Sequence, residues 1–111
     1  MRIETQHQGA VTVIKPFGPL NADEVESLRT TLHEAMGSSL GRFVIDVSEI
    51  SFVDSAGLEL LVDTTETLDQ SGQTLRLCGA NDTLREVFDI TEVGRQFELY
   101  EDINTAVRSF L

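Results

Sequence analysis

Cysteine is nearly absent from this sequence, and long apolar runs are missing altogether. The single cysteine, Cys78, excludes a disulfide within the chain, and its place in an apolar strand pattern favours a buried structural thiol. No apolar run approaches the roughly 20 residues needed to span a membrane. The segment Met1–Thr5 also lacks the apolar core of a signal peptide. We therefore expect a single cytoplasmic domain, residues 1–111, with no direct membrane insertion and enough length to form its own core.

Basic residues are also scarce. Eight lysines and arginines stand against 19 acidic residues, which gives a formal net charge of -11. This balance argues against binding to nucleic acid, whose phosphates attract basic proteins, and equally against an anionic membrane surface. Two interpretations of the acidity stay open: attraction to a basic protein partner, or an aid to solubility alone.

The residue patterns of common catalytic and cofactor sites are missing as well. The two histidines, His7 and His33, fall in different elements, and no zinc-ligand spacing or glycine-rich nucleotide motif is present. The run Val53–Gly57 resembles a nucleophile elbow but lacks its first glycine, and no histidine base is tied to Ser55. We therefore expect no metal, no cofactor and no enzymatic activity.

The apolar pattern alternates between strand and helix periods. Strands are expected at residues 1–7, 10–15, 43–47, 74–78 and 97–100, and helices after Asn21, at 55–70, after Asn81 and after Asp102. The order β-β-α-β-α-β-α-β-α predicts an α/β fold. It consists of a mixed, mostly parallel sheet of about five strands, with one antiparallel edge, covered by about four helices.

Finer expectations concern the first two helices. Asn21 is expected to be an N-cap, with Glu24 completing a capping box. In the second helix the expected core face is Leu58, Leu61, Val62, Thr65 and Leu68. Leu60 lies off this face, which suggests an exposed apolar anchor for a partner. In the preceding loop, Ile50, Phe52 and Val53 are expected to point inward.

Ser55 lies where a buried strand gives way to a helix, beyond the carboxyl end of the strand, where ligand sites gather in parallel sheets. A helix N-terminus tolerates a phosphate, because its N–H groups are free. The small residues Ala56 and Gly57 leave the hydroxyl accessible, and Gly57 suggests a close backbone approach. Spacing alone favours a plainer interpretation, in which Asp54 or Ser55 is only an N-cap.

Three segments together resemble the signature of STAS domains, a family that includes bacterial anti-anti-sigma factors. They are Phe43–Ser48, Phe52–Leu58 and the turn Gly18–Asn21. The order of elements is similar too, so the resemblance covers essentially the whole chain and implies a single STAS-like domain.

The resemblance implies that Ser55 is phosphorylated by an anti-sigma factor serine kinase. The unphosphorylated protein would bind that kinase and release a sigma factor, and a serine phosphatase would restore the binding state. Two departures are Asn21, where the family often has Asp, and Ala56, where it often has Ser. The family also implies an alternative, in which the chain is a cytoplasmic subunit of a lipid ABC transporter or a stress-sensing scaffold that docks without phosphorylation. A sensor of a small ligand is a third interpretation, for which the sequence has no pocket signal.

The second helix carries acidic residues beside its core face. Glu59, Asp63 and Glu66 share one side of the helix at a spacing of four and then three residues. This stripe would bind basic residues of the partner, or it is simply a solvated face. With it, the expected partner-binding residues are Asn21, Asp54, Ser55, Ala56, Gly57, Glu59, Leu60 and Asp63.

Overall fold

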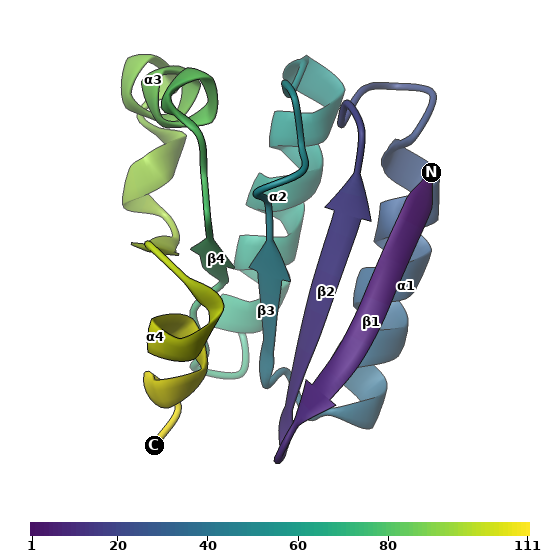
Figure 1. Cartoon of the computed structure of the whole chain (residues 1–111), viewed down its shortest axis with the longest axis vertical. Helices are drawn as coiled ribbons and strands as arrows, with labels where there is room; N and C mark the ends of the chain where they lie inside the picture. Colours follow the sequence, from purple (N-terminus) through teal and green to yellow (C-terminus); the bar gives the residue numbers. More distant parts are fainter.

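The computed structural model describes residues 1–111 and contains one five-stranded sheet and four α-helices (Figure 1). The strands are β1 (Arg2–Gln8), β2 (Val11–Phe17), β3 (Phe43–Asp46), β4 (Arg76–Cys78) and β5 (Glu98–Tyr100). The helices are α1 (Val25–Ser38), α2 (Ser55–Asp69), α3 (Asp82–Thr91) and α4 (Ile103–Arg108), with a short 3₁₀ helix, η1 (Val93–Arg95), before β5. The predicted order of strands and α-helices is confirmed.

The strands lie in sequence order across the sheet, β1-β2-β3-β4-β5. The edge strand β1 is antiparallel to β2, and every other pair is parallel. The register aligns apolar residues across the centre, since Ile14 pairs with Ile45 and Ile45 with Leu77. The mixed, mostly parallel sheet with one antiparallel edge is therefore as predicted.

The helices divide unevenly between the two faces of the sheet. From β2 onward, each strand-helix-strand connection leads to the next strand in the same direction across the sheet. Connections of the same handedness place their helices on the same face of the sheet. Consistently, α1, α2 and α3 share a core cluster of 18 buried residues. The last helix, α4, follows the final strand and covers the other face over a cluster of only four buried residues, Cys78 among them. Figure 1 shows α4 in front of the sheet, with α1 and α2 behind it.

The thiol of Cys78 is buried under α4, as the strand pattern predicts. Desolvation raises its pKa to about 12, and the nearby Asp46 and Asp102 carboxylates add to the rise. The thiol therefore stays protonated at neutral pH, as expected of a structural cysteine.

The start of α1 differs from the prediction. The side-chain oxygen of Asn21 accepts hydrogen bonds from the N–H groups of Asp23 and Glu24, at 3.1 and 3.2 Å, so Asn21 caps a turn. Regular helix begins only at Val25. Only half of the predicted capping box forms: the Glu24 N–H donates to Asn21, but the Glu24 carboxylate lies 2.7 Å from the amino group of Met1 and does not return to the Asn21 backbone. The helix includes Gly37 and ends at Ser38.

The predicted exposure of Leu60 is wrong. This side chain is only 1% exposed and belongs to the main core cluster, whereas Leu58 is half-buried. The buried face of α2 also includes Thr64 and Thr65, whose hydroxyls donate to the carbonyl groups of Leu60 and Leu61 at 2.8 Å. Because these hydroxyls are satisfied within the helix, the threonines can be buried at little cost. The core face is therefore rotated toward Leu60.

Candidate functional site

The site lies at the carboxyl edge of the sheet, where the connections that follow β2 and β3 meet. Leu20 and Val53 form an isolated parallel bridge. The N–H of Leu20 donates to the carbonyl of Phe52 at 2.9 Å, and the N–H of Asp54 donates to the carbonyl of Leu20 at 3.2 Å. Two loops that are far apart in the sequence thus hold each other as a short extension of the sheet.

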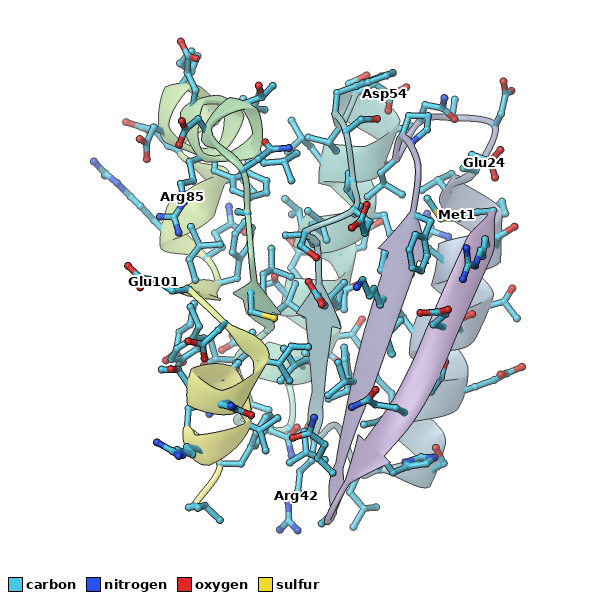
Figure 2. All side chains as sticks on the ribbon, viewed as in Figure 1. Met1, Glu24, Arg42, Asp54, Arg85 and Glu101 are labelled. Carbon is cyan, nitrogen blue, oxygen red and sulfur yellow. The ribbon has the colours of Figure 1, made fainter.

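Asp54 joins these two loops to α2. It is the N-cap of the helix, and one carboxylate oxygen accepts the N–H of Gly57 at 2.9 Å. The other oxygen accepts the N–H of Ala22 from the neighbouring loop at 3.1 Å. The side chain therefore caps α2 and also fixes the loop that leads to α1. In Figure 2, Asp54 lies at the end of the molecule toward which β2 and β3 point.

Ser55 is the first residue of α2 and is exposed. Asp54 supplies the capping oxygen, so the N-cap interpretation holds for Asp54 and leaves the Ser55 hydroxyl free of that role. The backbone N–H groups of Ser55 and Ala56 have no backbone acceptor, as expected in the first turn of a helix. Ser55 is thus a hydroxyl on the surface beside N–H groups that favour negative charge.

Gly57 is required by the close packing of α2 on the Leu20 loop. A Cβ atom at this position would lie 2.5 Å from the carbonyl oxygen of Leu20 and 2.5 Å from a methyl group of Val53. Both distances are too short for a real Cβ, and the clash with the Leu20 oxygen is with backbone, so the predicted close approach is confirmed. Ala56, beside it, is half-buried. The glycine therefore sets how near the helix, and with it Ser55, lies to the neighbouring loop.

The acidic stripe on α2 is only partly free. Glu59 and Glu66 are exposed, but Asp63 lies 3.7 Å from the guanidinium of Arg29 on α1. A half-exposed pair of this kind contributes little to stability. It does offset the charge of Asp63, which weakens the case for Asp63 as a free contact. The structure thus gathers Asn21, Asp54, Ser55, Ala56 and Gly57 at one edge, places Glu59 and Asp63 along α2, and buries Leu60.

The prediction for Phe52 is also wrong, because this side chain is exposed and not buried. It was expected to point inward with Ile50 and Val53, yet its side chain is 47% exposed. Ile50 is buried, and Val53 is half-buried at the bridge to Leu20, so these two neighbours fill the space beneath the loop. An exposed aromatic residue three positions before Ser55 is therefore part of the site. The exposure of Phe52 could not be predicted from its residue type, because apolar side chains are usually buried.

Other features of the fold lie away from this site. A cavity of about 420 Å³ beside α4 is lined by Asp46, Cys78 and Asp102, among others, but not by Asp54 or Ser55. No cluster of three or more histidine, cysteine, aspartate or glutamate side chains is placed to bind a metal ion. None of the helices combines the length and apolar character that crossing a membrane requires.

Comparisons with known proteins agree with this architecture. The family model described as STAS domain matches residues 2–106. The anti-sigma-B factor antagonist of Staphylococcus aureus is 29% identical over 91 residues, which cover 82% of this chain and 84% of that protein.

Two solved structures have the same fold. An anti-sigma-factor antagonist (STAS) domain protein from Planctomyces limnophilus is 28% identical, with a TM-score of 0.85 and 96% of each chain covered. The phosphorylated form of the Bacillus cell fate determinant SpoIIAA is 21% identical, with a TM-score of 0.72, and covers 99% of this chain and 100% of that chain.

Proposed function

We propose that this chain, which belongs to the STAS domain family, is an anti-sigma factor antagonist controlled by phosphorylation of Ser55. In the unphosphorylated state it binds an anti-sigma factor serine kinase and so releases a sigma factor. The kinase transfers phosphate to Ser55 and ends the binding, and a serine phosphatase restores it. The chain is a substrate and a binder in this cycle, with no catalytic residue of its own. Because the cycle consumes ATP, we assign it to the cytoplasm.

The observation that carries this proposal is that Asp54, and not Ser55, makes the structural hydrogen bonds at the start of α2. Asp54 already caps α2 through the N–H of Gly57 and holds the neighbouring loop through the N–H of Ala22. The Ser55 hydroxyl is therefore not needed for folding, and it is exposed at a fixed place. A hydroxyl presented in this way suits an acceptor that another protein's active site must reach.

Phosphorylation would act on binding through charge. A phosphate adds about -1.5 to -2 charge at pH 7. On Ser55 it would lie next to the Asp54 carboxylate, whose oxygens are committed to two backbone N–H groups. In a closed interface both charges must lose water, and like charges held together there cost several kcal/mol. Since about 1.4 kcal/mol is a tenfold change in affinity, the switch needs no large rearrangement of the fold.

Similar proteins support the same assignment. The relative from S. aureus is named an antagonist of an anti-sigma factor, and a protein of this fold has been solved in a phosphorylated form. The alternative, a subunit of a lipid ABC transporter or of a stress-sensing scaffold, would use the same edge for docking without phosphate.

The test is phosphate transfer by each anti-sigma factor serine kinase encoded in the same genome. Wild type, Ser55→Ala and Ser51→Ala are incubated with kinase and ATP and examined by mass spectrometry. Ser51 is an exposed serine of the same loop and serves as the matched control. We expect one phosphate on wild type and on S51A, none on S55A, and at least tenfold weaker kinase binding by the phosphorylated protein. Wild type that gains no phosphate, or S55A that gains it equally, contradicts the switch. Tight binding that ignores phosphate favours the alternative.

A further inference from the structure

The exposed ring of Phe52 is held on a rigid support. Its carbonyl accepts the N–H of Leu20 at 2.9 Å, and the next residue, Val53, forms the bridge to Leu20. On the other side Ile50 is buried in the core. A phenylalanine on a fixed backbone has only two rotatable side-chain bonds. It can therefore fill an apolar pocket with little loss of conformational entropy.

Phe52 and Ser55 fall within the area of one interface. Three residues of chain span at most about 10 Å, and both side chains are exposed. An ordinary protein interface buries about 800 Å² on each partner. An interface centred on the Ser55 hydroxyl is therefore wide enough to include the ring of Phe52.

The edge around these two residues is mostly acidic, and the few cations near it are the Met1 amino group, Arg2 and Arg85. The connections that follow β2, β3, β4 and β5 are residues 18–24, 47–54, 79–81 and 101–102. They contain no lysine or arginine, and their acidic residues are Asp23, Glu24, Glu49, Asp54, Glu101 and Asp102. The opposite edge differs, with Arg42 before β3 and with Arg95 and Glu92 around η1. Figure 2 shows Asp54 and Arg42 at opposite ends of the molecule.

This charge limits which partner can deliver a phosphate. A kinase that acts on Ser55 must bring the triphosphate of ATP up to the acidic edge. Negative groups repel one another in such a site unless cations lie between them. The cations that this chain places near the edge are already engaged: the Met1 amino group with Glu24, Arg2 with Glu4, and Arg85 with the carbonyl of Ala80. The exposed carboxylates of Asp23 and Glu49 have no such partner, so the basic side chains that face them come from the binding surface.

We infer that the surface that binds here has an apolar pocket for Phe52, with lysine or arginine residues around it that face the acidic edge. This inference rests on the proposed function and identifies the chemistry of the partner at the same site. The two parts have different kinetic roles. Charge complementarity speeds association, whereas a buried aromatic anchor slows dissociation. Phosphate on Ser55 does not remove the long-range attraction; it acts at contact, where it must be desolvated beside Asp54.

The experiment measures association and dissociation rates for the kinase that modifies Ser55, in 50 and 300 mM salt. We expect Phe52→Ala to raise the dissociation rate at least tenfold with little change in association. Phe52→Leu should recover most of the loss. Leu40→Ala is the matched control, because Leu40 is 72% exposed at the opposite edge. It should change neither rate more than twofold. Thermal melting of F52A confirms that the variant is folded.

Charge is tested separately with Glu49→Lys and its control, Glu34→Lys, an exposed acid in the latter half of α1. We expect E49K to slow association at least threefold in 50 mM salt and much less in 300 mM, since salt screens charges. E34K should have little effect at either salt concentration.

The outcomes separate this inference from the proposed function. F52A that behaves like L40A overturns the anchor, and E49K that behaves like E34K overturns the basic surface. In both cases transfer of phosphate to Ser55 would still stand. If no anti-sigma kinase binds the wild type, the proposed function and this inference fail together.

Discussion

The two edges of the sheet are built in different ways. At the carboxyl edge, the loops after β2 and β3 are bonded to each other, and Asp54 and Gly57 allow no looser arrangement. At the amino edge, the α1–β3 connection turns through Leu40 and Gly41, both with positive φ, and presents Leu40 to solvent. One edge holds a serine and an aromatic ring in fixed positions, whereas the other mainly reverses the chain. The difference suggests that the carboxyl edge is shaped for a partner.

Replacing a glycine at each edge should give effects of opposite sign. Gly57→Ala forces a Cβ to within 2.5 Å of the Leu20 carbonyl oxygen, so we expect a loss of about 1–3 kcal/mol in unfolding free energy. Gly37→Ala, near the amino-edge end of α1, places its Cβ where no atom lies within 4 Å. It should gain up to about 1 kcal/mol from helix propensity.

Urea unfolding of G57A, G37A and wild type measures both changes in unfolding free energy. If G57A is as stable as wild type, the loops at the carboxyl edge can accommodate a Cβ at position 57. The proposed contrast between the two edges would then be wrong.

A smaller effect is expected at Asp54. Asp54→Ala removes the N-cap of α2 and the acceptor for Ala22, and should cost about 1–2 kcal/mol in unfolding free energy. Asp54→Asn keeps a capping oxygen but has one acceptor fewer. It should therefore cost less than the alanine variant while still loosening the Ala22 loop.

Hydrogen exchange of the Ala22 amide distinguishes these roles. It should be faster in D54N than in wild type, with α2 still protected. Equal exchange at Ala22 in all three proteins would show that Asp54 acts only as a helix cap.

The smallest effect is expected at the amino edge. Leu40 has a φ of 56°, a conformation that costs a residue with a side chain about 1–2 kcal/mol and costs glycine almost nothing. Leu40→Gly recovers this strain but increases the entropy of the unfolded chain. We therefore expect a net gain below about 1 kcal/mol in thermal unfolding, with partner binding unchanged. A clear loss of stability would mean that the exposed leucine packs against something at this edge.

The candidate site was predictable in part because its signals are local. Asp54, Ser55 and Gly57 stand together where a strand pattern ends and a helix pattern begins, so the position of the serine and the close approach at Gly57 followed from the sequence. Leu60 and Phe52 were misplaced because α2 and its loop are apolar on more than one side. Burial there depends on what lies opposite, which no local pattern records.

The sequence by itself determined the order of strands and helices, the mostly parallel sheet and the acidity, since these follow from periodicity, chain direction and composition. Tertiary structure decided which face of α2 is buried, because Leu60 packs into the core cluster that α2 shares with α1 and the sheet. It also decided that Asp54 would bind Ala22, a residue 32 positions away, and that Phe52 would remain exposed. These features depend on contacts between segments that are far apart in the chain. Such contacts form only when the sheet has brought those segments together.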